Sequence, residues 1–211
     1  MTTLVCIDRD GTINYDDRDY LGGTDDWKNK VKILPGVVAG IKRLKKAGAL
    51  VYIISNQSGV AMKSLPLLTE TRAREVCEYV MKTLEERGAK IDGCKICIHV
   101  SKEYADKRRE IKFDASLVKA CGCRKPAIGM IKDIMKERNI SGARVYVIGD
   151  RATDVQTALN ARGTGILIPS ESLPGEDEKV KALKSRNALI MKNVKEAADF
   201  ILKKERKDTI S

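Results

Sequence analysis

Short, mostly apolar runs alternate along this chain with longer segments in which apolar residues recur every three or four positions. The runs cover residues 4–7, 49–54, 94–99, 145–150 and 165–168. Runs of this length, rich in Val, Ile and Leu, are typical of strands buried on both faces of a sheet. The periodic segments fit amphipathic helices at about 37–46, 76–84, 127–139 and 194–204. This alternation predicts an α/β fold with a doubly wound parallel sheet and right-handed crossovers.

The predicted elements fill the chain and leave no room for a large cap domain. We therefore expect one domain over residues 1–205, followed by a solvated C-terminal tail over residues 206–211. Loops 14–34 and 100–120 would then shape an open site. The apolar runs are far shorter than the roughly 20 residues needed to cross a bilayer. A cytoplasmic monomer without a membrane partner is expected.

The most informative polar group, Asp8-Arg9-Asp10-Gly11-Thr12, follows the first predicted strand. Ligands bind at this edge of open parallel sheets, and alternation along an extended chain aims both carboxylates the same way. Crowded carboxylates repel unless they share a cation or a proton. On its own the motif fits an acidic turn equally well, so both interpretations stay open at this point.

Three later segments supply groups that complement these acids. Residues 55–59 (Ser-Asn-Gln-Ser-Gly) follow the second predicted strand and offer hydroxyls, amides and backbone donors to a phosphate oxygen. Arg124 and Lys125 place two cations near a helix start, and Asp150 ends a further strand with Asp154 four residues on. Together these groups favour a phosphoryl site that binds a divalent metal.

In this order the segments resemble the four motifs of the haloacid dehalogenase superfamily of phosphatases, which implies that family's Rossmannoid core. The closer resemblance is to the branch of D-glycero-D-manno-heptose 1,7-bisphosphate 7-phosphatases, which also includes histidinol-phosphate phosphatases. It covers about residues 1–170. The motifs that carry it are Asp8 to Asn14, Leu34 to Val37, Ser55 to Gly59, a Cys-x-His followed by a Cys-x-Cys, and Arg124-Lys125-Pro126.

The resemblance implies hydrolysis of a phosphomonoester through an aspartyl-phosphate. Asp8 would attack phosphorus, while Asp10 would protonate the leaving oxygen and later deprotonate water. Magnesium would be bound by the side chains of Asp8 and Asp150 and by the backbone carbonyl of Asp10. Ser55 and Lys125 would hold the transferring oxygens. The residues predicted to bind the rest of the substrate are Asn56, Gln57, Ser58, Arg124 and Arg151.

Asp154 has two interpretations. It would orient Lys125 or a metal-bound water, or it is an acid stabilised by the dipole at a helix N-terminus. The expected substrate is a small phosphorylated metabolite, above all a sugar bisphosphate such as D-glycero-D-manno-heptose 1,7-bisphosphate. The alternatives are a histidinol-phosphate phosphatase, a polynucleotide 3′-phosphatase and a non-catalytic zinc-containing binding module.

A second cluster combines Cys97-x-His99 with Cys121-x-Cys123. Three thiolates and one imidazole match a closed, structural zinc site, which would fix the loop 97–123 that leads to the predicted catalytic lysine. The alternative is a set of buried free cysteines with a hydrogen-bonded histidine. Because Cys94-x-x-Cys97 is also ligand spacing, Cys94 could replace one of the four.

The chain departs from the family pattern in this loop. The first Cys-x-His lacks the usual proline, no second histidine follows it, and the connection from Val100 to Ala120 is longer than the pattern predicts. These differences bear on the zinc site and even more on the contacts to substrate.

Several enzyme classes are disfavoured by what the sequence lacks. His99 is the only histidine, so its use as a metal ligand leaves no imidazole base for a Ser-His-Asp or Cys-His hydrolase. There is no phosphate-binding loop of nucleoside triphosphatases and no dinucleotide-binding glycine turn. The net charge of +11 suits anionic substrates, nucleic acid included, but the aromatic content of 4% is low for a base-stacking surface.

Overall fold

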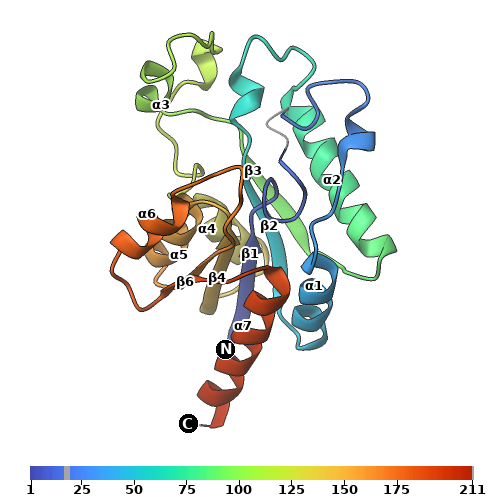
Figure 1. The fold of residues 1–211 in the computed structure, drawn as a ribbon, viewed down its shortest axis with the longest axis vertical. Coiled ribbons are helices and arrows are strands. Elements are labelled where there is room, and N and C mark those ends of the chain that lie inside the picture. The colour runs from blue at the N-terminus through green and yellow to red at the C-terminus, as the bar shows by residue number, and fades with distance from the viewer. Residues whose placement is uncertain (17–19, 211) are drawn as a thin grey trace.

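The protein is described here by a computed structural model that covers residues 1–16 and 20–210, without the side chains of residues 208–210. Residues 17–19 of the predicted loop 14–34 and Ser211 of the predicted tail lie outside the described residues. One parallel sheet of six strands has the order β3-β2-β1-β4-β5-β6 (Figure 1). The strand bounds are β1 Thr2–Ile7, β2 Leu50–Asn56, β3 Gly93–Cys97, β4 Ala143–Gly149, β5 Thr164–Leu167 and β6 Ala188–Ile190.

Helices cover both faces of this sheet. Their bounds are α1 Val37–Lys46, α2 Glu70–Glu86, α3 Lys102–Asp106, α4 Gly129–Glu137, α5 Ala152–Asn160, α6 Glu176–Ala182 and α7 Val194–Ile210. Ile41 of α1, Leu84 of α2 and Ile201 of α7 pack in one buried cluster with one face of the central strands. Ile131 of α4 and Ala158 of α5 pack in a second cluster on the opposite face. The predicted doubly wound α/β fold is confirmed.

The structure contains a strand and two α-helices that the sequence pattern did not predict, and a helix that is longer than predicted. The strand β6 and the helices α3 and α6 were not predicted, and α7 continues to Ile210, beyond the predicted end at residue 204. Glu205 stabilises this extension, because its carboxylate accepts hydrogen bonds from Thr3, Tyr146 and Arg144 on the neighbouring strands. No helix among the described residues is both long and apolar enough to cross a membrane.

The strand order reverses direction at β1, which pairs with β2 on one side and with β4 on the other. Such a reversal is the topological switch point of an open α/β sheet. The carboxyl ends of neighbouring parallel strands meet at one edge, and ligands bind there in open α/β sheets. The segment around α3 extends beyond this edge, at the upper left of Figure 1. No cap domain interrupts the described part of the chain, so the strand ends open directly onto these loops.

Candidate active site and metal-binding clusters

Three buried carboxylates gather at the switch point. Asp8 follows β1, Asp150 follows β4 and Asp154 lies in the first turn of α5, and each offers an oxygen within 4.8 Å of the others'. The backbone N–H of Asp8 donates to the carbonyl of Ile148 at 2.8 Å, which aligns the ends of β1 and β4. Gly11 allows the close approach, because a Cβ at this position would lie 2.1 Å from Asp150 Oδ2.

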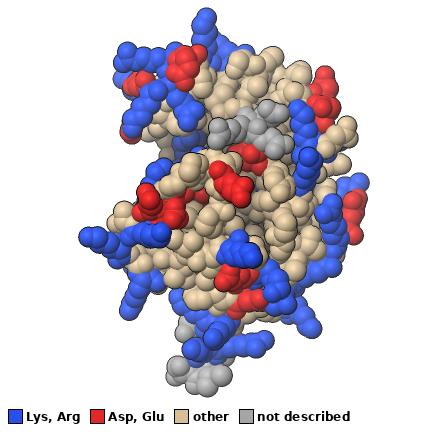
Figure 2. Space-filling view, viewed as in Figure 1, with Lys and Arg blue, Asp and Glu red and all other residues tan. Residues whose placement is uncertain are grey.

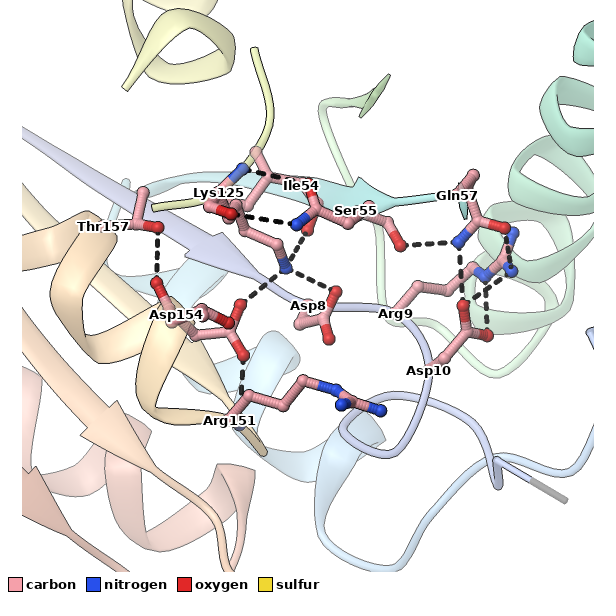
Figure 3. A network of polar contacts seen from close by, with 12 residues as sticks. Asp8, Arg9, Asp10, Ile54, Ser55, Gln57, Lys125, Arg151, Asp154 and Thr157 are labelled. Carbon is pink, nitrogen blue, oxygen red and sulfur yellow. Dashed lines mark hydrogen bonds and ion pairs between the residues drawn. The ribbon is translucent and has the colours of Figure 1, made fainter. Parts of the chain in front are cut away.

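Lys125 supplies the cation among these carboxylates (Figure 3). Its Nζ lies 2.7 Å from Asp8 Oδ1 and 2.6 Å from Asp154 Oδ1, and it donates to the carbonyl of Ile54 at 3.0 Å. Burial alone would lower the pKa of Lys125, but Asp154 and Asp8 outweigh burial and raise it above the usual range. The ammonium therefore stays charged in a buried position.

Asp154 combines the two interpretations given to it. Its Oδ1 pairs with Lys125, as expected of a residue that orients the lysine. Its Oδ2 accepts the backbone N–H of Arg151 at 3.1 Å, as expected of an acid at the N-terminus of α5. The two oxygens divide the two roles.

The carboxylate cluster fits a hard divalent cation. Both side-chain oxygens of Asp150 are buried without a hydrogen-bond partner among the described residues. Burial, with Asp8 and Asp154 nearby, raises the pKa of Asp150 to about 9. Burial also raises the pKa of Asp8 to about 6, although Lys125 opposes this shift. Such crowding is relieved by a cation that prefers oxygen ligands, so Asp8 and Asp150 could hold magnesium.

Asp10 points away from this cluster and is held by Arg9 and Gln57 (Figure 3). Arg9 Nε and Nη2 donate to its two oxygens at 2.9 Å and 2.7 Å. Gln57 Nε2 donates to Asp10 Oδ2 at 2.8 Å and to Ser55 Oγ at 2.7 Å. Burial alone would raise the pKa of Asp10, but the Arg9 guanidinium lowers it. Asp10 is therefore a carboxylate in this arrangement.

Arg9 is the site residue that the sequence analysis did not select. It is 1% exposed, and its Nη2 also donates to Gln57 Oε1 at 2.9 Å. The sequence did contain a signal for Arg9: it stands between two acids directly after a predicted buried strand. An arginine that is buried there requires an acidic partner, and both neighbours could supply one. Arg9 thus links Asp10 to Gln57 and through it to Ser55.

Two residues predicted to bind substrate contact the protein instead. Gln57 is engaged by Arg9, Asp10 and Ser55 as described above. Asn56 Oδ1 accepts the backbone N–H of Lys125 at 3.0 Å, and its Nδ2 donates to the Lys125 carbonyl at 3.2 Å. These contacts position the acid and the lysine, so direct binding of substrate stays a prediction for both.

A cleft of about 690 Å³ connects the carboxylates to the surrounding loops. This volume is in the range of small-molecule sites and larger than one phosphate requires. Asp8, Asp10, Ser55 and Lys125 line it, together with the other residues predicted to bind substrate. Those lining residues are Asn56, Gln57, Ser58, Arg124 and Arg151.

The predicted zinc ligands also meet in space. One donor atom from each of Cys97, His99, Cys121 and Cys123 lies within 4.8 Å of the others'. Cys97 Sγ is 3.6 Å from Cys121 Sγ, and His99 Nδ1 is 3.4 Å from Cys123 Sγ. The edges of a tetrahedral zinc site measure roughly 3.5 to 4 Å, given its bond lengths. Three sulfurs and one nitrogen so placed could hold zinc.

Cys94 belongs to the other face of the sheet. Cys97 packs in the cluster with α4, whereas Cys94 packs against the cluster that contains α1 and α2. The two residues are three positions apart in β3, and side chains that far apart along a strand point to opposite faces. Cys94 therefore does not join the cluster of four.

The metal content of the purified protein tests this second cluster. We expect about one zinc per chain in protein purified without chelator, since all four ligands are already gathered. Cys123→Ser should lower the content severalfold, whereas Cys94→Ser, the matched control, should leave it unchanged. Elemental analysis by mass spectrometry measures both. Wild-type protein with almost no zinc, or an equal loss in both variants, would contradict the assignment.

The comparisons with known proteins agree with this geometry. A family model described as HAD-hydrolase-like matches residues 122–197. The D-glycero-beta-D-manno-heptose-1,7-bisphosphate 7-phosphatase of Rhodopseudomonas palustris is 38% identical over 171 residues, which is 81% of this chain and 83% of that protein. The protein of the same name from Photorhabdus laumondii is 33% identical over 165 residues, which is 78% of this chain and 79% of that protein. The chain belongs to this family of haloacid dehalogenase-like phosphatases.

Solved structures show the fold of the family. A heptose 1,7-bisphosphate phosphatase from B. bronchiseptica, complexed with magnesium and phosphate, matches with a TM-score of 0.72. The match covers 96% of this chain and 99% of that one, at 23% identity. A putative HAD-like phosphatase from Mesorhizobium loti matches with a TM-score of 0.65 at 26% identity, over 82% of this chain and 77% of that one. The predicted family, fold and enzyme class are confirmed: the protein is a phosphatase.

Proposed function

We propose that this phosphatase removes one phosphate from a sugar bisphosphate, with magnesium bound and with Asp8 as the nucleophile. The observation that carries the proposal is the buried cluster in which Lys125 lies between Asp8 and Asp154 beside the unpartnered carboxylate of Asp150. The relatives above 30% identity are named for D-glycero-beta-D-manno-heptose 1,7-bisphosphate. This compound is the substrate that we propose.

The reaction has two steps on the residues of this chain. An Asp8 oxygen forms a bond to phosphorus as the bond to the leaving oxygen breaks, and Asp10 gives that oxygen a proton. Asp10, now a carboxylate, takes a proton from the water that cleaves the aspartyl-phosphate and restores Asp8. Arg9 holds Asp10 ionised in the structure, so the first step needs an added proton. Asp10 takes up this proton from solvent when the phosphate dianion arrives, because a nearby negative charge raises the pKa of a carboxyl.

Other residues stabilise the charge that develops during transfer. The Lys125 ammonium and the Ser55 hydroxyl lie at the carboxyl ends of the central strands, where the phosphoryl oxygens would be placed. Magnesium, held by Asp8, Asp150 and the Asp10 carbonyl, would neutralise the repulsion between carboxylate and phosphate. Metal binding would displace the proton that the raised pKa of Asp150 retains.

The alternatives receive less support. A binding module without catalysis does not fit a chain in which Asp8 and Lys125 are both in place and which belongs to a phosphatase family. A polynucleotide 3′-phosphatase needs surfaces on which bases stack, and aromatic residues are only 4% of this chain. Histidinol phosphate carries one phosphate, so it brings a single phosphate to a cleft of 690 Å³ that Lys125, Arg124 and Arg151 all line.

A phosphate-release screen with magnesium present tests the proposal. We expect kcat/KM for heptose 1,7-bisphosphate to exceed that for histidinol phosphate and for 3′-phosphorylated oligonucleotides by about tenfold or more, since each lost charge-assisted contact costs this much. Release of inorganic phosphate is the measurement. A higher kcat/KM on oligonucleotides would favour the polynucleotide 3′-phosphatase alternative, and no release from any substrate would contradict the proposal.

A further inference from the structure

Two cysteine thiols lie beside the arginine that holds Asp10. Cys77 belongs to α2 and Cys94 to β3, the edge strand of the sheet. The Cys94 thiol donates a hydrogen bond to the Cys77 sulfur. The same sulfur accepts a hydrogen bond from Arg9 Nη1 at 3.6 Å. We call Cys77 and Cys94 the α2–β3 thiol pair.

This thiol pair is separate from the four predicted zinc ligands. Cys94 packs against the cluster that contains α1 and α2, whereas Cys97 packs with α4 on the opposite face of the sheet. Cys77 is 2% exposed, and Cys94 is partly buried. A metal bound by the cluster of four therefore engages neither thiol of the pair.

Arg9 gives Cys77 the character of a reactive thiol. Figure 2 shows many Lys and Arg side chains on one face of the molecular surface, where water and salt screen their charge. The Arg9 guanidinium is buried, so solvent does not screen its charge at Cys77. The hydrogen bond from Cys94 and the charge of Arg9 lower the pKa of Cys77 to about 7, although burial opposes this shift. The thiolate is the form of cysteine that attacks oxidants.

Cys94 supplies the second thiol that a disulfide requires. Its pKa is raised by the hydrogen bond to Cys77 and by burial, so Cys94 keeps its proton while Cys77 is ionised. Redox-sensitive cysteines combine these features, because a thiolate reacts with the oxidant first and a neighbouring thiol then displaces the oxidised group.

We propose that Cys77 and Cys94 form a redox-active pair, which a peroxide converts to a disulfide and a dithiol reductant restores. The Cys77 thiolate attacks one peroxide oxygen, so an S–O bond forms as the O–O bond breaks and hydroxide leaves. Cys94 then attacks the Cys77 sulfur, so the S–S bond forms as the S–O bond breaks and a second hydroxide leaves. The two hydroxides take up the protons of the two thiols. Two electrons thus pass from the thiols to one peroxide, which becomes two waters.

The disulfide changes what holds Asp10. A disulfide sulfur carries no charge and is a poor acceptor, so Arg9 Nη1 loses its partner at Cys77. A buried donor without a partner is costly, which favours a shift of the guanidinium. The Arg9 contacts to both Asp10 oxygens and to Gln57 shift with it. Neither thiol lines the cleft, so oxidation lowers turnover through the position of Asp10 and not by contact with substrate.

Peptide mapping after oxidation tests the pair directly and does not depend on phosphatase activity. The protein as purified, with magnesium, is treated with hydrogen peroxide, alkylated in urea and digested with trypsin. Cleavage at the lysines and the arginine that flank the two cysteines should release residues 75–82 linked to residues 91–95. Cys97 falls in a separate peptide, so its oxidation is not confused with that of the pair. Cys6, whose pKa burial raises to about 12, is the internal control and should be recovered alkylated.

Phosphate release before and after the same treatment tests the link to Arg9. Wild-type turnover should fall by about tenfold or more, because a small displacement of a positioned catalytic group is costly, and dithiothreitol should restore it. Cys77→Ser keeps an oxygen acceptor for Arg9 but cannot form the disulfide, so peroxide should leave its turnover unchanged. Cys94→Ser should hold Cys77 as a sulfenic acid, which dimedone labels.

The outcomes separate the disulfide from its effect on turnover. The absence of a link between the two peptides, or a link that forms equally between other cysteines, overturns the proposal. A link with unchanged turnover keeps the redox pair and overturns its effect through Arg9. An equal loss of turnover in wild type and Cys77→Ser also overturns that effect, because it assigns the loss to oxidation elsewhere, such as at the predicted zinc ligands.

Discussion

Asp8→Asn should reduce turnover by at least about a thousandfold, because the amide cannot form the aspartyl-phosphate and the other groups of the site cannot replace it. The fold should persist. Asp8 is one of three crowded carboxylates, and burial already raises its pKa to about 6. A neutral amide of the same shape therefore removes repulsion as well as the ion pair with Lys125. Release of phosphate from heptose 1,7-bisphosphate, at saturating magnesium, is the measurement.

Asp133→Asn is the matched control for this variant. Asp133 is an exposed acid on α4, away from the residues that line the cleft, so its amide should leave turnover unchanged. Circular dichroism of both variants would show that the fold is retained. Asp8→Asn with turnover within tenfold of the wild type would exclude Asp8 as the nucleophile.

The central part of the site could be predicted because it depends on sheet topology. Asp8, Ser55 and Asp150 end or follow three apolar runs, and parallel strands place such ends on one edge whatever the details of packing. Lys125 reaches the same edge from a loop, and its position was inferred from the order of the family motifs. In the structure its Nζ lies 2.7 Å from Asp8.

The remainder depends on tertiary contacts that a local pattern does not contain. Asp10 is the neighbour of Arg9, but its other two partners are distant: Gln57 is 48 positions away and Cys77 lies on α2, so no short window indicates them. The helix α3 has five residues and no buried ones, and β6 has three residues at the edge of the sheet. Elements this short give no measurable periodicity.

Whether Cys94 replaces one of the four predicted zinc ligands could have been decided from the sequence. Cys94 and Cys97 were both placed in one predicted strand, and three positions along a strand lead to the opposite face. The ligand spacing Cys-x-x-Cys fits a turn, whereas here the strand geometry decides. Cys94 packs on the side of α1 and α2, and Cys97 packs with α4.

Lys125→Met should lower turnover by about a hundredfold or more and destabilise the metal-free protein by about 3–5 kcal/mol near pH 8. Methionine fills a similar volume but removes the ammonium that contacts Asp8 and Asp154. The Lys125 side chain is 2% exposed, so water cannot replace it. Buried carboxylates are then left without their cation. Unfolding in urea, without magnesium, measures the loss.

The pH dependence of this loss identifies its cause. With the lysine present the pKa of Asp8 is about 6, and without it burial and the neighbouring acids would raise it further above its unfolded value. The folded variant then binds more protons than the unfolded chain, so its stability falls as pH rises from about 5 to 8. The destabilisation relative to wild type should therefore be smaller at pH 5 than at pH 8. Lys132→Met, an exposed lysine on α4, is the matched control and should show neither effect. A loss of equal size at both pH values would mean that packing, and not the charge of Lys125, stabilises the cluster.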